Sequence, residues 1–123
     1  MGLDINFLKV RTKEENLAYF RKVNFLVGFF EDYFDKKVEN CENFKINKAS
    51  VEELKSRCVK VLENHDLAKT LLPTTAGFFF GDLEYDEYYF RDVEEVMHTC
   101  DEVLLPEFDD LDDDEYIVFY IWY

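Results

Sequence analysis

Apolar and polar residues alternate at both ends of the chain, which predicts two strands. Residues 3–10 begin Leu-Asp-Ile-Asn-Phe, so every second side chain is apolar, as in a strand with one buried face. Residues 116–123 are apolar at both alternating positions, which indicates a strand covered at least partly on each side. We expect these two strands to form the centre of a small sheet.

Helical spacing of apolar residues appears first near the N-terminus. Thr12, with Glu15 three residues later, has the form of a capping box, and an apolar stripe follows it. This pattern predicts one long helix from residue 12 to about residue 37.

Two further helices are predicted. Ser50 and Glu53 form a second capping box before an apolar stripe that ends at Leu62. The third helix is expected over residues 85–105, with Pro106 ending it.

The remaining segments are short. Phe44 and Ile46 suggest a weak strand, and residues 66–72 suggest a further helical turn before Pro73. Residues 77–81 read Gly-Phe-Phe-Phe-Gly and predict a short buried strand or a packed loop, and residues 107–115 predict a solvated loop. The expected fold is a single compact α+β domain spanning residues 1–123, with about three helices packed on a small sheet that contains the N- and C-terminal strands.

Composition favours a soluble protein that stays inside the cell. No apolar run approaches about 18 residues and no signal-peptide pattern opens the chain. The three cysteines lack CxxC spacing, which suits reduced cytoplasmic thiols. Cys58 and Cys100 fall on the apolar helical stripes, so we expect both to be buried.

The net charge of −14 is concentrated in the C-terminal half. Residues 73–123 hold 16 acids and a single base, Arg91, whereas residues 1–72 are almost neutral. The same half is rich in aromatic residues. This asymmetry predicts an electrostatically lopsided surface.

No motif for catalysis, cofactor binding or metal binding is present. His65 and His98 lie at a helix end and beside a core stripe, and the spacing of cysteine and histidine matches no usual zinc site. Residues 110–121 lack the glycine and the final glutamate of a calcium loop, and residues 77–81 lack the lysine of a phosphate-binding loop. We expect a protein that is not an enzyme and needs no cofactor.

The acidic half therefore suggests binding to a basic surface of another protein. Residues 86–102 carry a net charge of −6 over roughly 25 Å of expected helix, which approaches the charge spacing of nucleic acid. A protein that imitates the charge of nucleic acid in this way binds the partner protein itself. We therefore expect no direct contact with nucleic acid or with a membrane. The alternative is that the acids have no binding role and only keep the protein soluble. The candidate partner-binding residues are Asp82, Glu84, Tyr85, Asp86, Glu87, Tyr88, Glu94, Glu95, Asp101, Glu102, Phe108, Asp109, Asp110, Asp112, Asp113 and Asp114.

Five segments resemble a family of small uncharacterised bacteriophage and prophage proteins. They are residues 1–4 (Met-Gly-Leu-Asp), 19–24 (Tyr-Phe-Arg-Lys-Val-Asn), 71–74 (Leu-Leu-Pro-Thr), 77–81 (Gly-Phe-Phe-Phe-Gly) and 85–89 (Tyr-Asp-Glu-Tyr-Tyr). The resemblance implies a phage product in the bacterial cytoplasm, where such proteins often bind and block host proteins, including antiviral defence nucleases.

The resemblance also implies that the polar residues of these segments meet in the fold. An ion-pair network between the first and third helices is the preferred interpretation, and a ligand pocket is the alternative. The residues concerned are Asp4, Arg21, Asn24, Asp86 and Glu87.

Two other functions remain open. A small ligand-binding or enzymatic domain built around Asp4, Arg21, Asp86 and Glu87 would show a pocket with shifted carboxylate pKa values. A self-associating assembly factor would use exposed aromatic residues on the first helix, as a homodimer for example. The residues proposed for that contact are Phe25, Phe29 and Tyr33.

Overall fold

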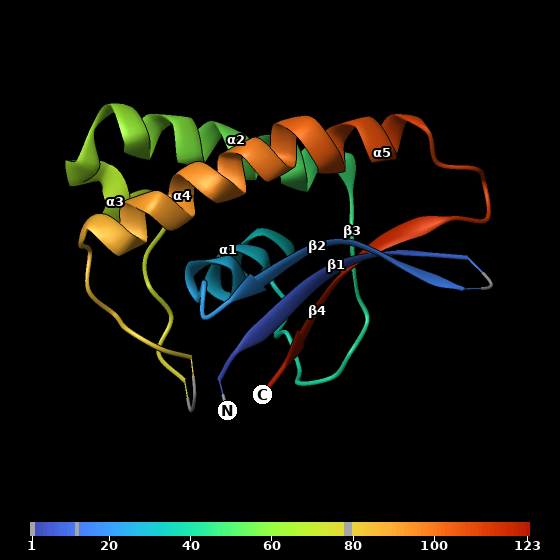
Figure 1. Ribbon diagram of the computed structural model, residues 1–123, viewed down its shortest axis with the longest axis horizontal. Coiled ribbons are helices and arrows are strands. Elements are labelled where there is room, and N and C mark those ends of the chain that lie inside the picture. Colours follow the sequence, from blue (N-terminus) through green and yellow to red (C-terminus); the bar gives the residue numbers. More distant parts are fainter. Residues whose placement is uncertain (1, 12, 78–79) are drawn as a thin grey trace.

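The computed structural model describes residues 2–11, 13–77 and 80–123. Within that part of the chain, four antiparallel strands form one sheet in the order β2-β1-β4-β3, and the helices lie on one side of it (Figure 1). The predicted α+β class is therefore confirmed. The strands are β1 (Asp4–Val10), β2 (Glu14–Arg21), β3 (Phe44–Ile46) and β4 (Tyr116–Trp122).

The two terminal strands form the centre of the sheet, as predicted. β1 and β4 pair along their whole lengths, with Ile5 opposite Ile121 and Phe7 opposite Phe119. The short strand β3 pairs with the other edge of β4, so the weak alternation at Phe44 and Ile46 is also a real strand. N- and C-termini consequently lie close together (Figure 1).

The prediction of one helix over residues 12–37 is wrong. Residues 14–21 form β2 beside β1, and the helix α1 (Phe25–Phe34) begins only after a turn at Lys22. Pairing with β2 in a hairpin satisfies the backbone groups along one edge of β1, and this pairing outweighs a weak local helix signal. Thr12, the expected cap, lies outside the described residues.

Three long helices and one short one cover the sheet. The two outer helices, α2 (Lys48–Glu63) and the helix that starts with α4 (Glu87–Thr99), pack side by side, and α1 lies between them and the sheet (Figure 1). After α2 the chain makes a 3-10 turn, η1 (His65–Leu67), and the single-turn helix α3 (Ala68–Leu71). The extra turn predicted before Pro73 is therefore present.

The last helix runs further than predicted. α4 continues through a π-helical turn, η2 (Cys100–Leu104), into α5 (Leu105–Asp109). Pro106 does not end the helix, because it sits in the first turn of α5, directly after the turn in which the Leu105 amide bonds the Cys100 carbonyl. A proline needs no amide donor in a first turn, and the π-turn has already broken the regular α-helical bonding. The loop predicted over residues 107–115 begins only after Asp109.

The cap of helix α2 is Asn47, three residues before the predicted cap Ser50. The Asn47 side chain accepts from the Ser50 amide at 2.8 Å, and the Ser50 hydroxyl lies 3.3 Å from the Asn47 amide. This is a reciprocal capping box in which Ser50 is the third helical residue rather than the cap.

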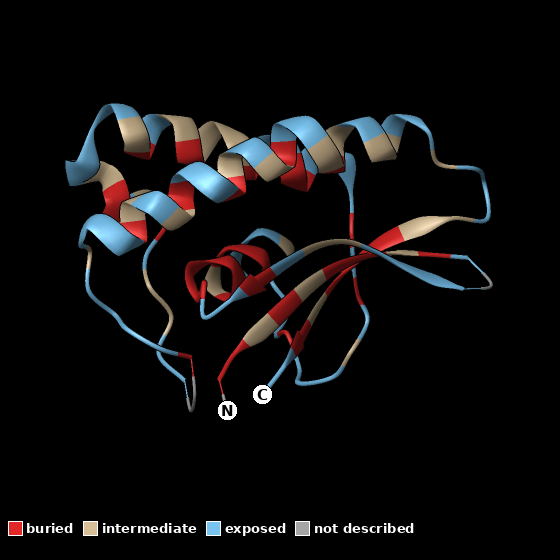
Figure 2. Cartoon of the chain, in the orientation of Figure 1, coloured by how far each residue is buried: buried red, intermediate tan, exposed pale blue. Residues whose placement is uncertain are grey.

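Phenylalanines join the three layers of the core. The Phe30 ring of α1 lies 6.0 Å from Phe7 of β1 and 4.6 Å from Phe119 of β4, and Phe25 packs against Tyr89 of α4 at 5.5 Å. Figure 2 shows the buried positions on α1 and on the helix faces turned toward it. Cys58 and Cys100 are fully buried in this core, as predicted.

Candidate functional site

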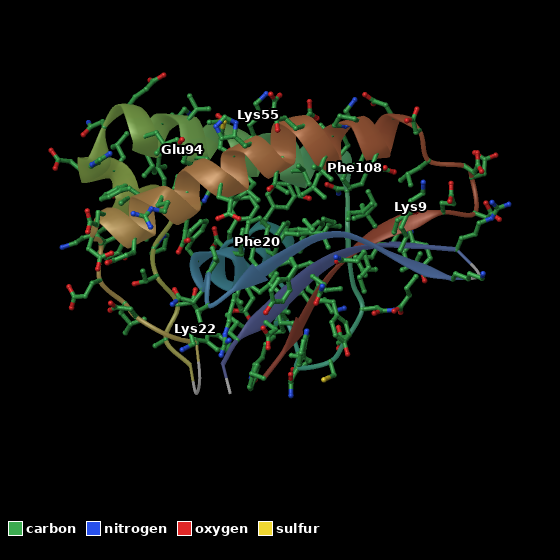
Figure 3. The ribbon with its side chains drawn as sticks, in the orientation of Figure 1. Lys9, Phe20, Lys22, Lys55, Glu94 and Phe108 are labelled. Atoms are coloured by element: carbon green, nitrogen blue, oxygen red, sulfur yellow. The ribbon has the colours of Figure 1, made fainter. Side chains whose placement is uncertain are left out.

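The candidate acids follow the last helix from end to end. Glu87, Glu94 and Glu95 are exposed on α4, and Asp101 and Glu102 are exposed on η2. Figure 3 shows Glu94 on α4 and Phe108 further along the same helix, on α5. The remaining candidate acids precede α4, at residues 82–86, or lie at the end of α5 and in the loop after it, at residues 109–114.

Three bases from the first half of the chain pair with some of the seven acids at residues 107–115. Arg11 lies 3.3 Å from Asp114 and 3.9 Å from Asp112, and Lys48 Nζ lies 2.7 Å from Asp109. Lys9 on β1 adds contacts of 3.2 Å to Glu107 and 3.8 Å to Glu115 at the two ends of this segment (Figure 3). Asp110 and Asp113 have no ion-pair partner among the described residues, so these bases neutralise the segment only in part.

The middle of the helix has partners as well. Lys55 on α2 lies 2.6 Å from Asp101, and this ammonium holds the pKa of Asp101 below its usual value. The His98 ring lies 3.9 Å from both Glu94 and Glu102.

The acids near the start of α4 are different. Among the residues that the structure describes, no ion pair shorter than 4.0 Å involves Asp82, Glu84, Asp86, Glu87 or Glu95. Two of them accept local hydrogen bonds: Asp86 caps α4 by accepting from the amides of Tyr88 and Tyr89 at 3.1 Å, and Asp82 accepts from the amide of Glu84 at 3.0 Å. Unpaired acids therefore remain around this end of the helix, as they do at Asp110 and Asp113 in the loop after α5.

The three candidate aromatic anchors have different environments. Tyr88 is 61% exposed, and the Arg91 guanidinium lies over its ring at 5.3 Å from the centroid. Tyr85 is half-buried, and its hydroxyl accepts a 3.0 Å bond from the amide of Thr74. Phe108 is half-buried against the core. Only Tyr88 is an open contact surface, and it lies among the unpaired acids.

A cavity of about 170 Å³ opens beside these acids. Its walls come from the end of β2, the start of α1, the segment leading to α4, and the first two turns of α4. The lining side chains include the bases Arg21 and Lys22, the acids Asp82, Glu84, Asp86 and Asp92, and the uncharged residues Asn24, Thr74, Tyr88 and Tyr89.

Asn24 fixes the walls of the cavity. This side chain is buried, with 3% of its surface exposed. Its amide nitrogen donates to the carbonyls of Phe80 and Asp82 at 3.2 and 2.9 Å, and its oxygen accepts from the amide of Thr75 at 2.9 Å. The side chain therefore ties the segment from Thr75 to Asp82 to the start of α1.

Two unusual backbone conformations shape the rim. Lys22 is left-handed, with φ 60°, and Gly81 has φ 93°. A Cβ added at Gly81 would lie 3.0 Å from the Cβ of Lys22. The structure thus favours glycine at this position. Of the predicted segment 77–81, residues 78 and 79 lie outside the described residues, and Phe80 is buried.

Asp92 is the functional candidate that sequence reasoning missed. Burial, followed by the negative charges of Glu95 and Asp86, raises the pKa of Asp92 to about 6, while Arg91 acts in the opposite direction. No hydrogen bond or ion pair to the Asp92 side chain is present among the described residues. Its position one helical turn after Tyr88 and Tyr89, directly beside the core residue Val93, is the signal that marks it in the sequence.

The residues singled out by the phage-protein resemblance meet only in part. Arg21, Asn24 and Asp86 line the cavity, but Glu87 does not. Asp4 lies opposite Arg21 in the sheet and accepts a hydrogen bond from the Tyr19 hydroxyl. No ion pair joins any of these five residues within the described ranges, so the predicted ion-pair network between helices is not what the structure contains.

The aromatic residues proposed for self-association do not form an exposed patch. Phe25 and Phe29 are 2% and 3% exposed and belong to the core, because α1 is covered by α2 and α4 as well as by the sheet. Tyr33 alone is exposed. The expectation that these three side chains share one open face is wrong.

The described residues contain no group of three His, Cys, Asp or Glu side chains arranged to hold a metal ion. In the same ranges, no helix has the length and apolar character needed to cross a membrane. Burial raises the pKa of Cys100 to about 12 and also raises that of Cys58, so both thiols stay protonated.

Comparison of the chain with protein-family models, with curated proteins and with solved structures gives no match.

Proposed function

We propose that this protein is a phage-encoded inhibitor that works in the bacterial cytoplasm by binding a basic surface of a host protein, such as a nucleic-acid-binding site of a defence nuclease. It acts by occupying that surface and not by catalysis. The contact is made by the exposed acids around the first half of α4, with Tyr88 as the aromatic anchor.

One observation supports this proposal above the others. Asp109, Asp112 and Asp114 near the end of the last helix have bases from the same chain within 4.0 Å, although Asp110 and Asp113 do not, whereas none of the acids around the start of α4 has one among the described residues. These unpaired acids lie beside the exposed Tyr88 and the cavity. Unpaired exposed carboxylates are available to a positively charged partner, and they attract it over a distance.

The ion pairs within the chain also change which of the candidate acids we expect to contact the partner. Asp109, Asp112 and Asp114 remain candidates from the sequence, but a partner must first displace Lys48 or Arg11 to reach them. A partner can contact the other acids without displacing a base of this chain. They are Asp82, Glu84, Glu87 and Glu95. The proposed contact is therefore centred on the start of α4 and weakens toward α5.

A pull-down from bacterial lysate tests the proposal. The protein carries a tag, the capture is done in low and in high salt, and partners are identified by mass. We expect a basic host protein that is captured in low salt and lost in high salt, because exposed charges are screened.

A pair of charge-reversal variants makes the test specific. Glu87→Lys, Glu94→Lys and Glu95→Lys together change the proposed surface. Glu39→Lys, Glu52→Lys and Glu63→Lys make the same change in charge at exposed positions elsewhere. The first variant should lose the partner and the second should keep it. Equal capture by both variants would show that this surface is not the contact.

A further inference from the structure

One face of the sheet has no helix over it in the part of the chain that the structure describes. The helices lie on the other face (Figure 1). The strand register shows which residues share the uncovered face, because Asn6 of β1 lies opposite both Tyr19 of β2 and Tyr120 of β4. Every second residue from these positions points the same way. We call this surface the open sheet face.

Aromatic side chains gather on the open sheet face. Tyr19 and Trp122 are 48% and 45% exposed, and Tyr116 and Tyr120 are half-buried over a small apolar cluster that is separate from the main core. The cluster consists of Leu8, Val10 and Val118. Tyrosine and tryptophan are enriched in protein interfaces, because each has a large apolar ring and a polar group that can stay hydrogen-bonded.

Hydrogen bonds hold two of these rings in place. Trp122 Nε1 donates to Asn6 Oδ1 at 3.0 Å, and the Asn6 amide in turn donates to Asn16 Oδ1 at 3.0 Å. The Tyr19 hydroxyl donates to the Asp4 carboxylate. Side chains that are already fixed in the free protein lose little freedom on contact, so the open sheet face is organised for binding before a partner arrives.

The charges on the open sheet face cancel, unlike those of the molecule as a whole. The strand residues that point to this face include two acids and two bases. They are Asp4, Glu14, Arg21 and Lys45. Two copies of a chain with a net charge of −14 repel each other, but a contact through this face brings no net charge together. A basic host protein would instead be attracted to the acids of α4.

The positions of these charges are complementary between two copies. Glu14 and Arg21 lie at opposite ends of β2, about 23 Å apart at the rise of a strand. Two sheets that pack face to face keep their strands nearly aligned, and a two-fold axis perpendicular to the strands places β2 antiparallel over β2 of the second copy. Each Arg21 then faces Glu14 of the second copy, and Trp122 faces Tyr116 of the second copy.

We propose that two copies of this chain form a symmetric dimer through the open sheet face, with Trp122 at the contact and Arg21 paired with Glu14 across it. The face is about 23 Å long and about 15 Å wide, which is smaller than a standard interface of about 800 Å² per partner. The dimer is therefore weak, and its population depends on concentration. Helix α4 lies in the outer helical layer, away from this contact (Figure 1), so the dimer presents two acidic surfaces.

Sedimentation velocity and tryptophan fluorescence of the full chain test the dimer together. Trp122 is the only tryptophan, so its emission reports on the open sheet face alone. Both are measured from about 1 to about 500 µM protein in about 150 mM salt. We expect a rise from monomer to dimer and a shift of the emission to shorter wavelength over the same range. A monomer throughout, or a dimer without the emission shift, would overturn the proposal.

A charge exchange tests the two-fold arrangement. Arg21→Glu and Glu14→Arg each place like charges opposite each other and should weaken the dimer by about tenfold. The double variant restores opposite charges and should dimerise like the original protein. Lys60→Glu and Glu63→Arg make the same changes at exposed positions of α2, in the helical layer, and should have a smaller effect. A double variant that dimerises no better than the single ones would overturn the proposal.

The outcome for the dimer is separate from that for the inhibitor. An emission shift caused by the captured host protein or by single-stranded DNA, with no dimer at any concentration, would assign the open sheet face to that occupant and overturn the proposal. If the dimer forms as described but the Lys variants of α4 keep the captured partner, the dimer stands and the proposed function falls.

Discussion

Asn24 shows how one polar side chain can organise a site. It is almost completely buried, and its three hydrogen bonds are the link between the start of α1 and the segment that carries Asp82. The sequence places it only as a polar residue in a segment that resembles phage proteins. Its role depends on Thr75 and Phe80, more than fifty residues away, which no local pattern reveals.

Replacing Asn24 should therefore damage the fold and the cavity together. We expect Asn24→Ala to lower the free energy of unfolding by about 2–3 kcal/mol, because it leaves buried backbone groups without partners. Asn16→Ala, which removes one exposed side-chain bond to Asn6, should cost less than about 0.5 kcal/mol. Urea denaturation measures both, and equal losses would contradict the role given to Asn24.

The raised pKa of Asp92 has a consequence for stability. In the folded protein this carboxyl keeps its proton up to about pH 6, whereas in the unfolded chain it loses it near pH 3.8. The folded state therefore binds more protons between these values, and this group lowers stability as the pH rises through that window.

Asp92→Asn should remove this loss. We expect it to raise the free energy of unfolding by about 1 kcal/mol at pH 7, a figure already reduced for solvent screening, and to have little effect at pH 4. Denaturation curves of the original protein and of Asp92→Asn at pH 4 and pH 7 measure this difference in the free energy of unfolding. A variant that is equally stabilising or destabilising at both would show that Asp92 does not titrate as described.

Elements with strong apolar patterns were predicted well, and elements set by distant partners were not. β1, β4 and α2 carry clear periodicities and lie where the sequence places them. β2 has few large apolar side chains. It forms a strand because its backbone hydrogen-bonds to the edge of β1. The π-turn that carries the last helix past Pro106 has no sequence signal of comparable strength.

The start of α2 gives a direct test at the scale of one element. Asn47→Ala should cost about 1 kcal/mol, because it removes the side chain that accepts from the Ser50 amide. Glu53→Ala, which removes the cap partner expected from the sequence, loses only a half-exposed pair with Arg57 and should cost a few tenths of a kcal/mol. If thermal unfolding shows a larger loss of stability for Glu53→Ala than for Asn47→Ala, the cap is at Ser50, as the sequence predicts, and not at Asn47.

At the scale of the whole molecule, the sequence shows which part of the chain carries the acids but not which bases lie beside them in the fold. Half of the chain holds nearly all of the excess acid, yet Lys9, Arg11, Lys48 and Lys55 of the other half lie against one part of it. The sequence-based set of candidate residues therefore divides into acids with a base of the same chain beside them, such as Asp109, Asp112 and Asp114, and acids with none, such as those around the start of α4. Only the three-dimensional pairing makes this division.

The same division predicts how salt affects stability. With a net charge of −14, repulsion should outweigh the few surface ion pairs, so added salt should stabilise the protein. Neutralising Glu87, Glu94 and Glu95 to Gln should reduce this gain. Neutralising Asp109, Asp112 and Asp114 to Asn should reduce it less, because those acids already face bases. Melting temperatures in about 20 and 300 mM salt measure the difference, and the opposite ranking would contradict the assigned pairing.

The most direct test of the account is to map where a basic chain contacts this protein. Hexa-arginine is titrated into the labelled full chain, and the shifts of the amide signals are followed residue by residue. We predict that the shifts concentrate on residues 82–95 and at the cavity, and that they are small over residues 109–115. Shifts that concentrate on the loop after α5, or that are uniform over all acidic positions, would contradict the claim that the unpaired acids around α4 are the binding surface.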